Sequence, residues 1–104
     1  MKGPETRLRK KIQEALQKKY PEALFLKIHG GPMQNVGIPD LLCCVKGMFI
    51  GLEIKRPGKK PTPAQAIMFN TIRQAGGWAD YATSVDEALG VTEEALSRRR
   101  QEAK

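Results

Sequence analysis

The stretch that decides the fold is GIPDLLCCVKGMFIGLEIKRPG, residues 37–58. Its apolar residues form two runs on either side of Lys46-Gly47, which predicts a β-hairpin with its turn at those two residues. A symmetric turn there places Asp40 directly opposite Glu53 on one face of the hairpin, whereas a loop of odd length would shift the pairing by one residue. The sequence therefore predicts two acidic side chains side by side at one end of a short sheet.

Lys55 joins these two acids, because side chains alternate along a strand and Glu53 and Lys55 share a face. Directly opposed like charges destabilise a sheet unless a positive charge lies between them. That charge is either Lys55 or a divalent cation that prefers oxygen ligands, Mg²⁺ or Mn²⁺. A cation would make this a phosphodiester-hydrolysing site. The simpler alternative is an exposed ion pair at a strand end, which contributes little.

The patterns on both sides of the hairpin predict an α/β protein in which helices flank a small mixed β-sheet. We expect one domain over residues 1–104, with a basic tail from about 97 to 104. The expected order is α-β-β-β-α-β-α: a helix over 5–20, strands over 23–28, 39–45 and 48–55, a helix from the cap at Thr62 to about Ala75, a strand over 78–82, and short helices over 84–89 and 92–100.

The net charge of +7 is unevenly distributed. Residues 1–73 hold fourteen Lys and Arg residues against five acids, while residues 74–96 hold five acids and no base. This asymmetry predicts a basic face for a polyanion such as nucleic acid. The alternative is a solvated surface with some bias.

Two further features of the sequence exclude a membrane-spanning protein and a structural zinc site. No apolar run is long enough to span a bilayer and no signal peptide is recognisable, so we expect a cytoplasmic protein that is not bound to a membrane. Cys43 and Cys44 are adjacent and point to opposite faces of a strand, so they cannot readily pair. With a single histidine, the chain has too few soft ligands for a structural zinc site.

Each of the two longer helices carries a polar residue at the start of its apolar stripe. On the first helix, Glu5 shares an arc with the apolar residues, while Glu14 falls nearly opposite. Glu5 is therefore either a site residue or a favourable charge near the helix N-terminus. On the second helix, Gln65 completes a capping box with Thr62, and its amide alternatively reaches the site formed by the hairpin.

Taken together, these motifs resemble the virus-type replication–repair nuclease (VRR-NUC) domain, a branch of the PD-(D/E)xK nuclease superfamily. Residues 37–40 match its G-x-P-D motif, and residues 53–58 match its E-x-K-x-P-G motif. Pro63-x-Gln65 matches the glutamine that opens its second helix, and Glu5-x-x-Leu8 matches its first-helix glutamate. The resemblance covers residues 5 to 90, approximately, which is nearly the whole chain.

This resemblance implies a restriction-endonuclease-like core that hydrolyses DNA phosphodiester bonds with Mg²⁺ or Mn²⁺. It implies a metal site formed by the carboxylates of Glu5, Asp40 and Glu53 and the main-chain carbonyl of Ile54. Lys55 and Gln65 would complete the catalytic set. Stand-alone members this short resemble Holliday-junction resolvases, which cut four-way DNA junctions and tend to be homodimers.

Other basic residues are candidates for contacts with DNA. Arg56, Lys59 and Lys60 follow the catalytic strand and are expected beside the scissile phosphate, although a solvated loop would also explain them. His29 lies in a glycine-rich loop that is expected to approach DNA, or that simply turns. The main expectation is a metal-dependent endodeoxyribonuclease acting on branched DNA. The alternatives are a non-catalytic DNA-binding module, or a subunit that cuts only with a partner protein.

Overall fold

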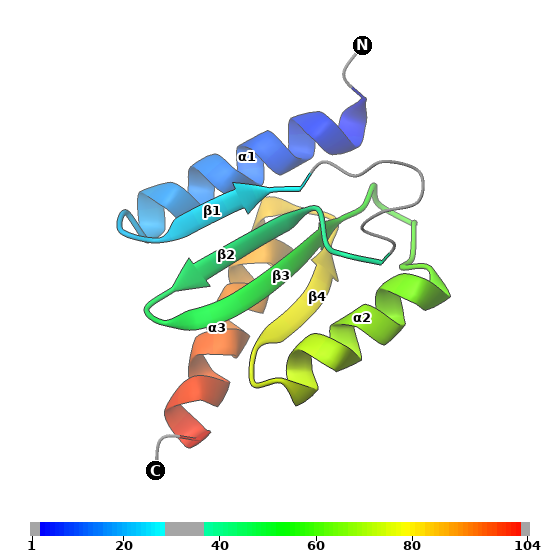
Figure 1. The fold of residues 1–104 in the computed structure, drawn as a ribbon. Coiled ribbons are helices and arrows are strands. Elements are labelled where there is room, and N and C mark those ends of the chain that lie inside the picture. The colour runs from blue at the N-terminus through cyan, green and yellow to red at the C-terminus, as the bar shows by residue number, and fades with distance from the viewer. Residues whose placement is uncertain (1–2, 29–36, 103–104) are drawn as a thin grey trace.

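The computed structural model describes residues 3–28 and 37–102. The expected α/β class and the order α-β-β-β-α-β-α are confirmed (Figure 1). None of the helices in these two ranges is long and apolar enough to cross a membrane. The elements are α1 (Pro4–Lys19), β1 (Leu24–Lys27), β2 (Leu41–Val45), β3 (Met48–Ile54), α2 (Pro63–Gln74), β4 (Trp78–Ala82) and α3 (Val85–Glu102).

The hairpin of β2 and β3 has the predicted register. Val45 pairs with Met48 across the turn, and the ladder continues to Leu41 opposite Leu52. Both turn residues have positive φ, 53° at Lys46 and 83° at Gly47, as a tight hairpin turn requires. Strand β2 begins at Leu41 rather than at the expected residue 39, so Asp40 lies just beyond the ladder.

The four strands form one sheet in the order β1-β2-β3-β4. The first three strands are antiparallel neighbours, while β4 pairs with β3 in parallel. A parallel pair needs a crossover connection, and α2 provides it between β3 and β4. This crossover brings the start of α2 near the end of β3, where the predicted site lies (Figure 1).

The two faces of the sheet are covered unequally. Helices α1 and α3 pack on one face, and α2 packs on the other face at the β3–β4 side (Figure 1). Alternate residues of β2 and β3 turn into the layer of α1 and α3, as a two-residue period dictates. The buried core there includes Ile12, Leu16, Leu41, Cys43, Val45, Met48, Ile50, Leu52, Ile54, Ala88, Ala95 and Leu96.

Gly51 sets the close packing on the α2 side of the sheet. A Cβ atom at this position would lie 2.8 Å from Cγ of Pro39 and 3.3 Å from Cδ1 of Ile72. The missing side chain therefore lets the buried Pro39 and helix α2 both sit directly on β3. This packing fixes Asp40, the residue after Pro39, at the end of the sheet.

The expectation of two short helices over 84–89 and 92–100 is wrong, because one helix, α3, spans Val85–Glu102. Gly90 lies in its interior at a cost of about 1 kcal/mol relative to Ala. Burial of Ala88, Thr92 and Ala95 on one face of α3 offsets that cost. The hydroxyl of Thr92 donates to the carbonyl of Ala88 at 3.0 Å, which adds a bond across the same turn.

Arg98, Arg99 and Arg100, from the expected basic tail, belong to this helix. The guanidinium carbon of Arg98 lies 4.0 Å from the ring centre of Trp78, and that of Arg73 lies 4.1 Å from it. The indole is therefore stacked between α2 and α3, which stabilises both helices against β4.

Candidate active site

Asp40 joins three parts of the chain at the end of the sheet. Its main-chain carbonyl accepts a hydrogen bond from the N–H of Ile28 at 2.9 Å, just after β1. Its carboxylate Oδ2 accepts a hydrogen bond from the N–H of Ile54 at 3.0 Å, at the end of β3. The side chain thus continues the β2–β3 pairing one step past the ladder, and its carboxylate is held in one position.

Glu53 is a buried acid, with a relative exposure of only 4%. One carboxylate oxygen, Oε2, lies 3.7 Å from Nζ of Lys55. The other, Oε1, is buried and has no hydrogen-bond partner among the described residues. Burial first, and then the charge of the neighbouring Asp40, raise the pKa of Glu53 to about 8, and the ammonium of Lys55 only partly opposes this.

These contacts exclude the simpler alternative of an exposed ion pair at a strand end. The side chains of Glu53 and Lys55 are only 5% and 15% exposed, so the pair is almost fully removed from water. A buried carboxylate with an unpartnered oxygen is costly by itself, and a second acid beside it adds repulsion. The residues present therefore fit a cation bound between Asp40 and Glu53.

Glu5 approaches this site from the other side of the sheet. Its Oε2 accepts a hydrogen bond of 3.4 Å from the N–H of Arg56, the second residue after β3. Glu5, which the sequence places at the N-terminal end of the buried face of α1, is itself exposed. Over residues 3–28 and 37–102, no three or more His, Cys, Asp or Glu side chains converge closely enough to hold one metal ion. The structure brings Asp40 and Glu53 together, with Glu5 at the rim.

Gln65 forms the capping box that its sequence context predicts. Its Oε1 accepts from the N–H of Thr62 at 2.9 Å, and its own N–H donates to Oγ1 of Thr62 at 3.2 Å. The capping box does not use the side-chain Nε2 of Gln65. This amide nitrogen therefore stays available to donate a hydrogen bond at the candidate active site.

Gly37 connects the start of α2 to the acidic loop, the segment 37–40 that ends at Asp40. It has φ of 82°, and a Cβ atom here would lie 2.6 Å from the main-chain oxygen of Ala64. Only glycine fits that combination of backbone conformation and close approach. The segment that delivers Asp40 therefore rests directly on the first turn of α2, where Gln65 lies.

The cations that follow the site lie on an exposed turn. Arg56, Lys59 and Lys60 are all exposed, and the N–H of Lys59 donates to the carbonyl of Arg56 at 3.0 Å. Gly58, with φ of 88°, makes this turn possible. His29, the remaining candidate for contacts with DNA, lies outside the described residues.

Solved structures resemble this chain, two of them over most of its length. One, described as "VRR_NUC domain", is 22% identical, aligns with a TM-score of 0.61, and covers 81% of this chain and 92% of its own. This chain has the VRR-NUC fold. The second structure, described as "VRR_NUC domain protein", is 18% identical with a TM-score of 0.57, and covers 93% of this chain and 92% of its own. No family model and no curated protein matches the sequence.

The VRR-NUC fold confirms the expected nuclease-type architecture. At these identities the likeness concerns the fold, so the roles of individual residues depend on their geometry. Cations of α1 and β1 that were not among the individually predicted DNA-binding residues line a groove beside the sheet. The available signal was the recurrence of polar residues every three or four positions along one side of the first helix.

Proposed function

We propose that this protein is a metal-dependent endodeoxyribonuclease. The observation that carries the proposal is the buried carboxylate of Glu53, which has one unpartnered oxygen and lies beside Asp40 and Lys55. A fold rarely retains such an arrangement without a ligand, because a buried carboxylate with an unpartnered oxygen beside a second acid is costly unless a cation or a proton neutralises it. The nuclease-type fold supports the same conclusion.

A divalent cation satisfies these oxygens better than a proton does. Mg²⁺ and Mn²⁺ prefer carboxylate and carbonyl oxygens, and both kinds of ligand are found here. In an extended strand the N–H and C=O of one residue leave on the same side. The carbonyl of Ile54 thus leaves β3 on the side where its N–H bonds to Asp40. Asp40, Glu53 and this carbonyl are the proposed ligands, and Glu5 would join them from α1.

The bound cation would polarise a phosphoryl oxygen and lower the pKa of a bound water. Lys55 is placed to stabilise the negative charge that develops on the phosphate, since its ammonium group is already directed at Glu53. The amide Nε2 of Gln65 would donate a hydrogen bond to the water or to the phosphate. Hydrolysis adds the water oxygen to phosphorus and breaks one P–O bond. The leaving oxygen takes a proton and is released as a hydroxyl.

Branched DNA, in particular the four-way Holliday junction, is the proposed substrate on the basis of the family resemblance of the sequence motifs. A two-fold symmetric junction calls for two sites, so a homodimer belongs to the same proposal. Exposed leucines lie on the sheet face that α2 leaves open, with Leu24 at 57% and Leu26 at 51% exposure. We place the contact with the second copy on this face. A double Leu24→Thr and Leu26→Thr variant should sediment as a monomer, whereas a dimer that persists would place the contact elsewhere.

The test uses labelled four-way junction and matched linear duplex, each incubated with Mg²⁺, with Mn²⁺ or with chelator. The control is Asp40→Asn, which keeps an oxygen to accept from Ile54 but removes the charge. Metal-dependent cutting of the junction alone, lost in the variant, supports the whole proposal. Cutting of both DNAs supports the chemistry and removes the junction preference. Binding without cutting under every metal condition leaves a non-catalytic or partner-dependent DNA-binding module.

A further inference from the structure

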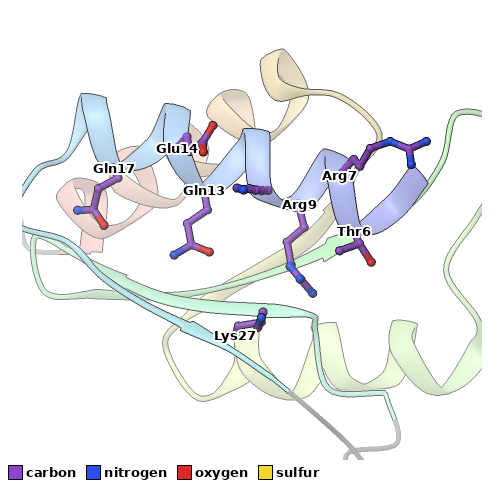
Figure 2. A pocket seen from close by; sticks show the side chains of 8 residues that line it. Thr6, Arg7, Arg9, Gln13, Glu14, Gln17 and Lys27 are labelled. Atoms are coloured by element: carbon purple, nitrogen blue, oxygen red, sulfur yellow. The ribbon is translucent and has the colours of Figure 1, made fainter. Parts of the chain in front are cut away.

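A groove of about 550 Å³ runs between helix α1 and strand β1. Figure 2 shows the side chains of Arg9 and Gln13 pointing from α1 down towards Lys27 on β1. All the described residues that line the groove are polar or charged: Thr6, Arg7, Arg9, Lys10, Gln13, Glu14, Gln17 and Lys27. A groove with this lining does not suit a hydrophobic helix or a lipid tail, so its ligand is polar.

The charges of the groove select an anion. Among the described residues that line the groove, Arg7, Arg9, Lys10 and Lys27 carry a positive charge and Glu14 carries the one carboxylate. In Figure 2, Glu14 and Arg7 both point away from the sheet, whereas Arg9 points towards Lys27. Low-dielectric walls lined by charges of one sign raise the local concentration of the opposite charge. An extended polyanion is therefore the kind of ligand that this groove fits best.

One end of the groove is closed by a structural contact. The side-chain amide of Gln17 donates to the carbonyl of Pro21 at 3.0 Å and lies 3.4 Å from the carbonyls of Tyr20 and Ala23. These bonds fix the turn between α1 and β1, so Gln17 serves the fold rather than a ligand. The amide of Gln13 and the hydroxyl of Thr6 provide neutral hydrogen-bond donors between the cations.

The other end of the groove opens at the candidate active site. Thr6 lines the groove, and its neighbour Glu5 accepts the hydrogen bond from Arg56 at the end of β3. At 1.5 Å per residue, the helix from Thr6 to Gln17 is about 17 Å long. This length is enough for the groove to contact more than one phosphate of a DNA strand.

We propose that this groove binds the sugar–phosphate backbone of duplex DNA next to the bond that is cut. The proposal rests on the proposed function in so far as that function makes DNA the ligand. The arginines suit it, because a guanidinium group binds two phosphate oxygens at once. The groove carries no sequence readout in this role and positions the duplex, as contacts to phosphates do.

The alternative explanation for these cations is a solvated helix face and a lysine that protects the edge strand β1 from pairing with other chains. An acidic peptide is the other polyanion that such a groove accommodates. Both alternatives predict different binding data from the DNA proposal, so the experiment is designed to separate them.

The experiment measures the affinity for a 30-bp duplex by fluorescence anisotropy in chelator, at several salt concentrations. The groove variant is Arg9→Gln with Lys27→Gln, and the control variant is Lys18→Gln with Arg100→Gln, exposed residues that do not line the groove. The groove variant should lose at least about tenfold in affinity at low salt, and its salt slope should fall by about 1.8. The control pair should retain most of the affinity and of the slope. A pair of exposed lysines, Lys10→Gln with Lys27→Gln, carries the same expectation if the Arg9 variant is unstable.

Equal losses in the groove and control variants would overturn the inference. It would also fall if the groove variant binds DNA normally and loses affinity only for poly-glutamate, since the ligand would then be an acidic peptide. The outcome is separable from that of the proposed function. If the protein cuts no DNA but the groove variant loses affinity for DNA, the nuclease proposal is wrong and the groove proposal stands. If the protein cuts DNA but the groove variant keeps its affinity, the groove proposal is wrong and the nuclease proposal stands.

Discussion

The carboxylate of Asp40 accepts a hydrogen bond from the main-chain N–H of Ile54 at 3.0 Å, one residue beyond the last pair of the β2–β3 ladder. This bond fixes the acidic loop to the strand that carries Glu53 and Lys55. The same carboxylate also raises the pKa of Glu53 through its charge. Asp40 therefore has a structural role and an electrostatic role, and substitutions can separate the two.

Replacement of Asp40 by Asn and by Ala should have different effects on stability but the same effect on activity. Asn keeps an oxygen that accepts from Ile54, so we expect a midpoint of urea unfolding close to that of the parent. Ala leaves the N–H without its partner and should cost about 1–2 kcal/mol in the free energy of unfolding. Both variants should lose metal-dependent DNA cutting. Substantial cutting by the Asn variant would mean that this charge is not needed at the site.

The stability of the protein in chelator should depend on pH through Glu53. Its pKa is raised from 4.5 to about 8 in the folded state. The folded protein therefore holds a proton that the unfolded chain has lost, and this stabilisation is fully present below about pH 4.5 and is lost as the pH rises through about 8. The free energy of unfolding should fall by up to about 1.4 kcal/mol per pH unit within this window.

Urea unfolding at pH 5, 6, 7 and 8 measures this dependence. In Glu53→Gln the same series should be flatter, because the amide does not titrate. A parent protein and a Gln variant with the same pH profile would show that Glu53 is ionised without a cation, contrary to the electrostatics described above.

Glu5 and Glu14 offer a matched pair of carboxylates on one helix. Glu5 contacts the end of β3, whereas Glu14 lines the groove farther along α1. Glu5→Gln should raise the Mg²⁺ concentration needed for half-maximal cutting, by about tenfold if one charged ligand is lost. Glu14→Gln should leave that concentration unchanged. Equal responses of the two variants in a Mg²⁺ titration of cutting would exclude Glu5 from the metal site.

Substitutions at Gly37 and at Gly58 distinguish the cost of backbone strain from the cost of lost packing against α2. Both have positive φ, but a Cβ atom at Gly37 would lie 2.6 Å from the main-chain oxygen of Ala64, whereas Gly58 has open space around it. Ala at Gly58 should cost only about 1 kcal/mol for the left-handed backbone. Ala at Gly37 should cost more and should also reduce cutting, because it displaces the acidic loop from α2. Thermal melts and cutting rates of the two variants check this, and equal effects would contradict the packing argument.

Local sequence patterns determine the parts of the fold that were predicted correctly. The turn residues Lys46 and Gly47 set the hairpin register, and Thr62 with Gln65 begins α2 as a capping box should. The juxtaposition of Asp40 and Glu53 followed from that register alone. Each of these features depends on residues close together in the sequence or on the fixed two-residue period of a strand.

Features that depend on tertiary packing were not predictable in this way. Gly90 would end many helices, but α3 continues through it because Ala88 and Thr92 are buried against the sheet. A helical wheel places Glu5 on the apolar side of α1 but does not reveal that Glu5 is exposed and bonds to the N–H of Arg56. The groove beside β1 likewise depends on how α1 crosses the edge of the sheet, which the sequence pattern does not specify.

The central claim, that a divalent cation binds between Asp40 and Glu53, is tested most directly by calorimetric titration of the protein with Mn²⁺ at pH 7 in two buffers of different ionisation enthalpy. We expect saturable Mn²⁺ binding that releases about one proton, because Glu53 must lose its proton to ligate the metal. Glu53→Gln should abolish or greatly weaken that binding, and Glu14→Gln should not. Absence of saturable binding, or the same isotherm in Glu53→Gln, would contradict the claim.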